Sequence, residues 1–338
     1  MKPPSGRPLL VACALVLCGC STSSSPGAVA SAPAIATVSA APALRVPFED
    51  RVQSSIDIDF PDELVSAGGY VWVKTDDGHV LQVDPGKNSV VADIKVDTTS
   101  DPSHYCQGLG TDGTNVWACS AAGDETSKTI DVVLIDPRAK KVVHTVKLGK
   151  VFGQLGIPFL RDRLWVLTGE GDRLVGVDVA TGRPEAGIEL GARCSQVASS
   201  GASLFVACGP DNLLLRVDPE EAKVTQRLAI SNPLNLAAAA NGVWLSQGDA
   251  VTRLDAQSLS PVAVFTGLPG EKDIYATTDA VWVRSKAGFV YRIDPESNTL
   301  AEQIRSSRAL SMGGIAVTSD SIWTTASDED VLIRLKRT

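Results

Sequence analysis

The sequence contains few of the residues that most often carry out catalysis or bind nucleic acid. Only 3 of its 338 residues are His, and aromatic residues make up 5% of the chain. The 31 Lys and Arg residues are scattered and are outnumbered by 39 Asp and Glu residues, so the net charge of −8 has the wrong sign for a nucleic-acid partner. No P-loop, Ser-His-Asp order or dinucleotide fingerprint is present, and the glycine-rich stretch 108–113 lies in a predicted hairpin rather than at a strand-to-helix turn. These absences favour a binding role over catalysis.

The apolar stretch near the N-terminus, Leu9–Leu17, is too short to span a bilayer as a helix. It leads into Leu17-Cys18-Gly19-Cys20, which resembles the lipobox of bacterial lipoproteins. The resemblance implies that residues 1–20 are a signal peptide and that Cys20 is lipidated. The protein would then lie in the cell envelope, outside the cytoplasm, held to the membrane by its lipid anchor alone. An ordinary secretory signal is the alternative.

The next segment, residues 21–48, consists mostly of Ser, Ala, Pro, Gly and Val. Such a composition lacks the bulky apolar side chains that a core needs, so the segment is predicted to be a disordered tether. As a flexible coil it would span on the order of 30 Å. One folded domain is expected from residue 49 to residue 338.

This domain is built from a repeated sequence, which is the strongest pattern in the chain. All six Trp residues stand in the middle of short apolar triplets, and a Phe fills the one gap in the series. The seven aromatic residues are Trp72, Trp117, Trp165, Phe205, Trp244, Trp282 and Trp323. Successive aromatic residues are 38 to 48 positions apart, which is the period of a β-propeller blade.

Each repeat has the pattern of four short antiparallel strands joined by turns. An apolar residue stands eight positions before each aromatic residue, a turn rich in Gly, Asn or Asp separates the two, and most copies have a later strand that ends in Asp. The seventh repeat ends after its third strand, whereas the N-terminal segment Val52–Phe60 has the alternation of an unpaired fourth strand. We therefore predict an all-β, seven-bladed propeller whose ring is closed when strand 52–60 completes the last blade.

The repeat over residues 50–338, with its aromatic triplet and its Ile-Asp-Pro strand end, resembles the YVTN-type and streptogramin-lyase-like propellers. The resemblance implies the fold strongly and the function weakly, since some members are lyases or hydrolases and many have no known reaction. Streptogramin lyases use a catalytic His in the loop before a late blade, with a nearby Glu and a bound Mg²⁺. The matching loops here, 268–274 and 231–235, contain no His. This argues against lyase activity, because the general base is missing.

Four cysteines lie within the repeats, and each pair flanks one predicted hairpin. In an exported protein this spacing predicts the disulfides Cys106–Cys119 and Cys194–Cys208. A site with four thiolates around a metal is the alternative, but it would require blades two and four to converge across blade three.

The residue nine positions before each aromatic residue is predicted to line the narrow end of a central channel. These residues are Glu63, Gly108, Gly156, Gln196, Asn235, Asp273 and Gly314. The glycines are expected to leave room on one side while the carboxylates and amides converge on the other. Gln107 and Lys272 directly precede two of these positions and are expected nearby. The set predicts a pocket for a small ligand or a cation, with a merely solvated channel mouth as the alternative.

His104 is the one His placed in a loop between blades, where propeller ligands usually bind. It is a candidate ligand-binding residue, although a lone loop His is more often without a function. Blade two also has a longer spacing between Trp117 and Asp136 than the other blades, with the extra residues in 121–128. Such an insertion is either a binding loop or a tolerated surface loop.

The sequence supports two functional hypotheses. The first is a membrane-anchored binding or scaffolding module without a cofactor, which engages a protein, a glycan or a small ligand through the face that carries the inter-blade loops. We define these as the loops that lead from the last strand of one blade to the first strand of the next. The second is a streptogramin-lyase-like or lactonase-like enzyme, assisted by a divalent cation near Glu63 and Asp273.

Overall fold

The structure is a computed structural model, and it describes residues 36–39, 42–99, 101, 104–123, 129–149, 156–239, 242–270, 272–286, 289–307 and 309–337. The predicted signal peptide, its lipidation site Cys20 and the first part of the predicted tether lie outside these residues. Among the residues that are described, no helix is long and apolar enough to cross a membrane.

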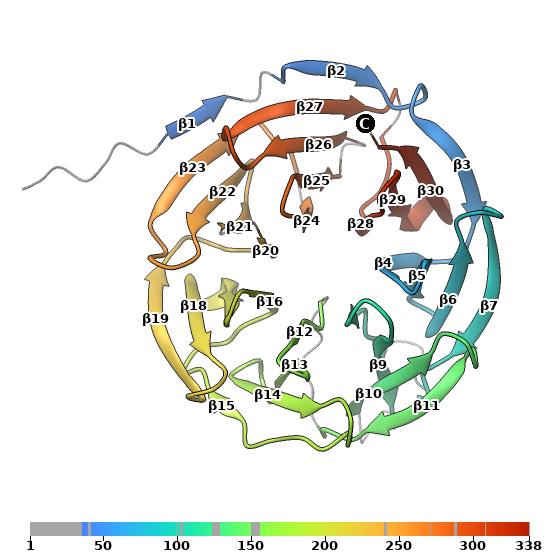
Figure 1. The fold of residues 1–338 in the computed structure, drawn as a ribbon, viewed down its shortest axis with the longest axis vertical. Coiled ribbons are helices and arrows are strands. Elements are labelled where there is room, and N and C mark those ends of the chain that lie inside the picture. The colour runs from blue at the N-terminus through green and yellow to red at the C-terminus, as the bar shows by residue number, and fades with distance from the viewer. Residues whose placement is uncertain are drawn as a thin grey trace, which may run out of the picture. The chain divides into compact units, whose positions relative to one another are not determined.

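The domain from residue 36 onward is a ring of seven antiparallel four-stranded sheets, which we number as blades 1 to 7 (Figure 1). Blade 1 consists of β4 (Pro61–Ala67), β5 (Tyr70–Thr75), β6 (His79–Asp84) and β7 (Ser89–Lys95), and blade 2 consists of β8 (Leu109–Thr111), β9 (Val116–Ala122), β10 (Thr129–Asp136) and β11 (Lys141–Val146). Blade 3 consists of β12 (Phe159–Leu160), β13 (Arg163–Thr168), β14 (Arg173–Asp178) and β15 (Ile188–Glu189), and blade 4 consists of β16 (Gln196–Ser200), β17 (Ser203–Cys208), β18 (Leu213–Asp218) and β19 (Lys223–Ala229). Blade 5 consists of β20 (Leu236–Ala239), β21 (Gly242–Gln247), β22 (Ala250–Asp255) and β23 (Pro261–Thr266), and blade 6 consists of β24 (Lys272–Ala276), β25 (Val281–Ser285), β26 (Phe289–Asp294) and β27 (Thr299–Arg305). Blade 7 consists of β28 (Ile315–Val317), β29 (Ser321–Ala326) and β30 (Val331–Lys336), together with β3 (Val52–Asp57) from the N-terminal end of the domain. The predicted fold class is confirmed.

Blade 7 closes the ring by joining the two ends of the domain. Strand β3 pairs antiparallel with β30, with Ser55 opposite Ile333, so the predicted closure is confirmed. The strand ends at Asp57, three residues earlier than predicted, because the chain turns there toward blade 1. Phe60 has a positive φ of 48° in this turn, and its backbone N–H donates to Asp330 Oδ1 at 2.9 Å.

Two further strands lie outside the ring and differ from the predicted disordered tether. Strand β1 (Ala36–Ser39) pairs in parallel with β23, and β2 (Leu44–Pro47) pairs in parallel with β27 (Figure 1). They satisfy backbone groups that the outer strands of blades 5 and 6 would otherwise leave open. Phe48 fixes this segment, because its side chain is buried in a cluster with Ile304 and Leu310 and its N–H donates to Arg305 O at 2.7 Å.

The hydrophobic core lies between adjacent blades. All six Trp side chains and Phe205 are buried. Trp165 of blade 3, for example, shares a cluster with Val197 and Leu204 of blade 4. The aromatic residue that marks each repeat in the sequence therefore fills the wedge between one blade and the next, which explains its regular recurrence.

The Asp that ends the third strand of a blade is explained by the turn that comes after it. In six blades the Asp Oδ1 accepts hydrogen bonds from backbone N–H groups two or three residues later. The six residues are Asp84, Asp136, Asp178, Asp218, Asp255 and Asp294. The same turns receive polar side chains from the preceding blade: Arg216 donates to Gln257 O at 2.6 Å, and Arg334 donates to Pro85 O at 2.6 Å across the closing joint of the ring.

Candidate functional site

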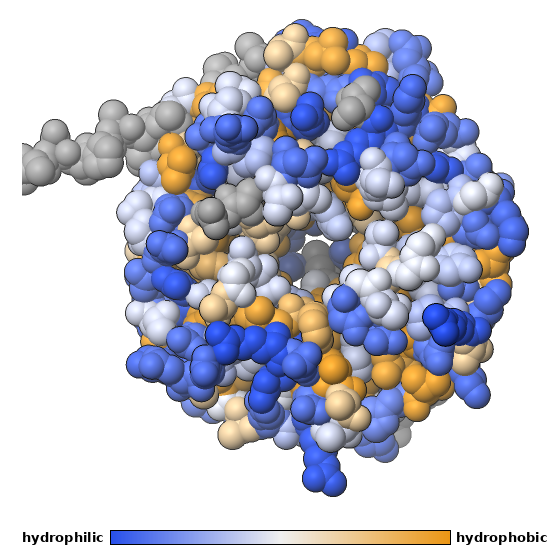
Figure 2. Space-filling view, viewed as in Figure 1, coloured by the Kyte–Doolittle hydropathy of each residue, from blue (hydrophilic) through white to orange (hydrophobic). Residues whose placement is uncertain are grey.

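A cavity of about 290 Å³ lies on the axis of the ring and is lined by residues of the innermost strands and the positions just before them. Figure 2 shows the hollow at the centre of one face. Because each innermost strand comes directly after an inter-blade loop, the first residues of these strands lie at the end of the cavity that these loops surround.

Four of the sequence-predicted residues come together at this end of the cavity. Glu63 and Asp273 are the third and second residues of β4 and β24, Gln196 is the first residue of β16, and Asn235 directly precedes β20. All four line the cavity, and we call them the collar. Gln196 is buried, whereas the other three are partly exposed. The predicted convergence of carboxylates and amides is therefore observed.

The residue after each predicted channel position is aliphatic, and it lines the same cavity. We call this set the aliphatic ring: Leu64, Leu109, Ile157, Val197, Leu236, Ile274 and Ile315. Six of the seven side chains are buried, and Leu236 is partly exposed. Most of these side chains are packed in the clusters between blades, so they expose little apolar surface to the cavity, whose polar groups lie at the end near the inter-blade loops.

The glycines do not all leave room as predicted. Gly156 lines the cavity. A Cβ on Gly314, however, would lie 2.6 Å from Leu64 Cδ2 and 3.1 Å from Asp62 O. The glycine therefore permits close contact between blades 7 and 1, and its space is already filled. Gly108 has a backbone role, since its carbonyl accepts a hydrogen bond from Cys119 N at 2.8 Å.

The carboxylates of the cavity are held in an environment that disfavours their charge. Burial raises the pKa of Asp273 to about 6, although its oxygens accept hydrogen bonds from Ile274 N at 2.9 Å and Ile315 N at 3.0 Å. Burial, together with the negative charges of Asp273 and Asp62, raises the pKa of Glu63 well above its usual value.

Asp62 directly precedes Glu63 and is the least satisfied group near the collar. Burial raises its pKa to about 7, and the charges of Asp76 and Asp273 add to the effect. Its Oδ2 atom is buried and has no hydrogen-bond partner among the described residues. Its backbone carbonyl accepts a hydrogen bond from Thr325 Oγ1 at 2.6 Å, which connects blades 1 and 7.

Two fully buried cations lie in the blades that supply the carboxylates. Lys74 of β5 contacts Asp97 Oδ1 at 3.4 Å, and burial lowers its pKa. Arg284 of β25 donates to Thr324 Oγ1 at 2.9 Å and to Ser311 O at 2.7 Å, and burial lowers its pKa to about 10. Neither is among the sequence-predicted residues, although each stands two positions after a Trp, where the other five blades have Cys, Leu, Ala, Ser or Thr.

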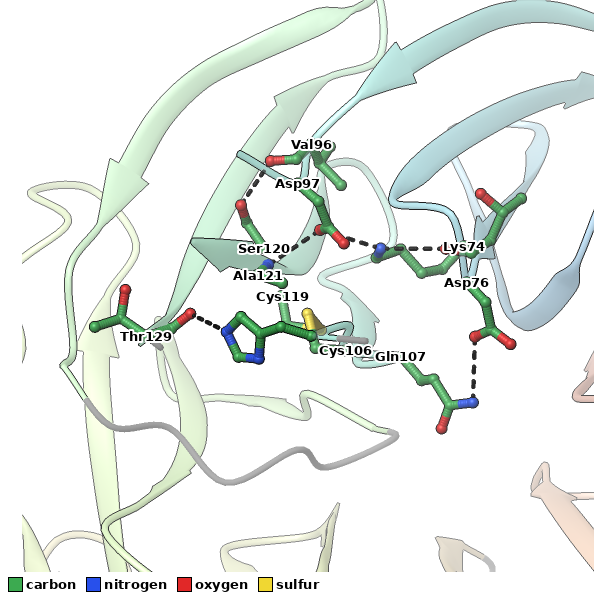
Figure 3. The surroundings of a disulfide bond; sticks show 12 residues. Lys74, Asp76, Val96, Asp97, Cys106, Gln107, Cys119, Ser120, Ala121 and Thr129 are labelled. Atoms are coloured by element: carbon green, nitrogen blue, oxygen red, sulfur yellow. Dashed lines mark hydrogen bonds and ion pairs between the residues drawn. A yellow bond between two sulfur atoms is a disulfide. The ribbon is translucent and has the colours of Figure 1, made fainter. Parts of the chain in front are cut away.

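His104 and Gln107 are not among the residues that line the axial cavity. Gln107 lies in the network between blades 1 and 2 (Figure 3). His104 Nε2 is 2.8 Å from Thr129 O, so this ring is engaged by the backbone at the start of β10. Gln107 donates to Asp76 Oδ1 at 3.4 Å. His104 and Asp76 line a second pocket of about 500 Å³, together with Phe60, Asp77, Lys95, Asp97, Thr99 and Asp101.

Both predicted disulfides are present, Cys106–Cys119 and Cys194–Cys208. The first lies within the network between blades 1 and 2, where Asp97 contacts both Lys74 Nζ and the backbone N–H of Ala121 (Figure 3). The disulfides therefore fix the inter-blade loops that precede blades 2 and 4 to the second strands of these blades.

Two predicted features are only partly described. Lys272 begins β24, where its backbone pairs with Ser285, and the structure describes nothing of its side chain. The insertion of blade 2 lengthens the hairpin of β9 and β10, in which Ala121 pairs with Ile130 and Ala122 with Thr129; residues 124–128 lie outside the described part.

The arrangement of the carboxylates does not correspond to a metal centre. Within the described ranges, no group of three His, Cys, Asp or Glu side chains is placed to hold a metal ion. The collar carboxylates and amides are instead suited to hydrogen-bonding or pairing with a polar ligand.

The fold and the axial cavity define the class of this protein as a closed, seven-bladed β-propeller. No protein-family model and no curated protein sequence matches the chain. Solved structures match it throughout the ring: Kuenenia stuttgartiensis hydrazine synthase is 12% identical with a TM-score of 0.65, covering 83% of this chain and 97% of that chain. The β-propeller domain of Myceliophteria thermophila Cps50 (Swd1) is 13% identical with a TM-score of 0.66, covering 85% and 99%. The WD40 domain of Neurospora crassa Pan2 is 10% identical with a TM-score of 0.66, covering 83% and 90%. Identities this low establish a shared fold alone.

Proposed function

We propose that this protein is a binding or scaffolding module that engages its ligand or partner through the inter-blade loop face, with the axial cavity as the ligand pocket. The observation that carries the proposal is the collar, where Glu63, Gln196, Asn235 and Asp273 converge on the axial cavity. Convergent polar groups in a concave pocket are a usual feature of a small-ligand site.

The proposal includes a location outside the cytoplasm and a lipid anchor at Cys20. The lipobox-like sequence before Cys20 supports the anchor. The two disulfides support an oxidising compartment, because cytoplasmic proteins rarely keep such bonds. The repeat pattern supports membership of the YVTN-type or streptogramin-lyase-like propellers.

An enzymatic role is the second candidate, and the raised pKa values of Asp62 and Asp273 favour it. Perturbed carboxylates in a cavity are typical of general acids and bases. The loops that would carry the His of a streptogramin lyase contain none, so any reaction would depend on the carboxylates themselves.

A thermal-shift screen of the full chain against sugars, divalent ions, amines and macrolactones tests the binding role. A ligand present at a hundred times its Kd adds about 2.7 kcal/mol to stability, which raises the melting temperature measurably. The shift should disappear in Gln196→Ala and persist in Glu296→Gln, a change in the exposed turn between β26 and β27. Turnover of a macrolactone that Asp273→Asn abolishes would favour the enzyme instead.

A further inference from the structure

We infer that a second site, a groove beside blade 2, binds a neutral, hydroxyl-rich ligand of the carbohydrate class. The groove has a volume of about 750 Å³ and is lined by strands β9, β10 and β11 and by the segment that leads out of blade 1. We call it the blade 2 groove, and its polar side chains include Lys95, Thr98, Thr129, Asp131, Thr145 and Lys147. None of the described residues that line it also lines the axial cavity, so the inference goes beyond the proposed function.

Asp131 of β10 is the buried acceptor of the blade 2 groove. Its relative exposure is 9%, and no donor or cation among the described residues forms a hydrogen bond or an ion pair with its carboxylate. Ser120 lies directly opposite it on β9, but its hydroxyl donates to Val96 O at 2.6 Å (Figure 3). A buried carboxylate without donors is unfavourable. A ligand that donates hydrogen bonds to Asp131 would therefore satisfy a group that the protein leaves open.

The charges around Asp131 favour a neutral ligand. Burial raises the pKa of Asp131, and the positive charge of Lys147 acts in the opposite direction. Lys95 lies on another side of the same groove, where its Nζ donates to Asp77 O at 2.5 Å. A cationic ligand at Asp131 would lie near two ammonium groups, and an anion bound by the lysines would lie near a buried carboxylate. A neutral ligand avoids both repulsions.

The remaining polar groups of the groove are hydroxyls. Thr98, Thr129 and Thr145 line it, and in the part of the chain that the structure describes none of their hydroxyls forms a hydrogen bond. Each can donate one hydrogen bond and accept two. A sugar ring offers the matching groups, because its hydroxyls also donate and accept, and two adjacent hydroxyls can donate to the two oxygens of one carboxylate. Val142, which is partly exposed, adds apolar surface for the C–H groups of such a ring.

The acidic residue and the groove are particular to blade 2. Asp131 stands five positions before Asp136, the last residue of the third strand. In the other six blades this position is the first residue of the third strand and is His, Arg, Leu, Ala, Phe or Val. Strand β10 begins two residues earlier, at Thr129, because the insertion lengthens its hairpin with β9. The fold of the repeat therefore does not require a carboxylate here, which favours a role in binding.

Isothermal titration calorimetry of the full chain at pH 7.5 tests the inference with glucose, galactose and mannose. At least one of these sugars should bind with a Kd of about 1 mM or lower. The amino sugar and the uronic acid derived from that sugar should each bind at least about 10-fold more weakly, because each brings a charge that one part of the groove repels.

Three substitutions test the assignment to the blade 2 groove. Asp131→Asn should weaken sugar binding by about 10- to 100-fold, since hydrogen bonds to a charged group are lost, whereas Asp57→Asn, at an exposed residue of β3, should leave it unchanged. Thr145→Val changes an exposed side chain without changing its shape and should weaken binding by about 3- to 10-fold. Lys147→Met removes one of the two ammonium groups, so the amino sugar should then bind almost as well as the neutral sugar.

The outcomes are distinct from those that test the axial cavity. The absence of neutral-sugar binding at millimolar concentration overturns the inference, as does sugar binding that survives both Asp131→Asn and Thr145→Val. Binding of glycine in place of the sugars would show that the ligand is a zwitterion and that the carbohydrate class is wrong. Sugar binding that Gln196→Ala abolishes and Asp131→Asn preserves would place the sugar in the axial cavity, which overturns the inference and supports the proposed function. If the inference is correct, Gln196→Ala leaves sugar binding unchanged.

Discussion

Replacing Asp62 with Asn should stabilise the protein at alkaline pH and leave its stability almost unchanged in acid. The substitution preserves the size of the side chain and removes its charge. It does not touch the backbone carbonyl that accepts the hydrogen bond from Thr325 Oγ1. It also removes one of the negative charges that raise the pKa of Glu63.

The expected magnitude is set by the pKa of Asp62, which burial raises from 3.8 to about 7. The folded state therefore binds this proton more tightly than the unfolded state does. The resulting contribution to the free energy of unfolding is fully present below pH 4 and is lost as the pH rises through 7. Each pH unit between these limits corresponds to about 1.4 kcal/mol. Partial screening by solvent at the cavity reduces the total, so we expect Asp62→Asn to be more stable than the natural protein by about 2 to 4 kcal/mol at pH 8.5.

Urea unfolding measured by tryptophan fluorescence provides the assay, because all six Trp side chains are buried in the folded protein. The difference between the two proteins should be small at pH 4 and should increase steadily to pH 8.5. An equal difference at both pH values, or a variant that is less stable at pH 8.5, would refute the assignment of a proton to Asp62. Asp57→Asn, a change at an exposed residue of β3, is the control and should show no such pH dependence.

Three further predictions concern the integrity of the ring. The double substitution Cys106→Ser/Cys119→Ser should lower the free energy of unfolding by about 3 kcal/mol, measured by urea titration, because it removes a loop constraint from the unfolded chain; no loss would show that the bond adds nothing. Arg334→Met should cost about 2 kcal/mol by the same method, since it breaks the hydrogen bond to Pro85 O at the closing joint, whereas the exposed Arg173→Met should cost less than about 0.5 kcal/mol. Phe48→Ala should accelerate hydrogen exchange in β2 but not in β3; equal acceleration in both would mean that the outer segment and the ring open together.

The sequence predicts the ring well because its signals recur seven times. An aromatic residue that fills the wedge between blades and an Asp that binds the next turn have local causes, and each copy supports the others. The same register places Glu63, Gln196, Asn235 and Asp273 correctly at the cavity, since equivalent positions of a repeated strand lie at equivalent heights on the axis.

The errors concern features whose causes are not local in the sequence. Strand β2 is mostly exposed, and both β1 and β2 pair with the ring through their backbones, so their composition resembles that of a disordered segment. The repeat pattern suggests open space at Gly314, but only the approach of Leu64 from another blade reveals that the space is occupied. Lys74 and Arg284 are visible in the sequence as charged residues at a repeat position where the other blades have uncharged ones. That they are buried in the two blades that supply the collar carboxylates is seen only in the three-dimensional structure.

The N-terminal segment runs past blades 5 and 6 before it completes blade 7, and this order has a mechanical consequence. A pulling force applied at the N-terminal end reaches β1 first, then β2, and only afterwards β3. The two outer strands carry four backbone pairs each, and they can detach without opening any blade of the ring. A pulled chain should therefore lose the pairing of β1 with β23 and then that of β2 with β27. The pairing of β3 with β30, which closes the ring, is the last to be exposed to the force.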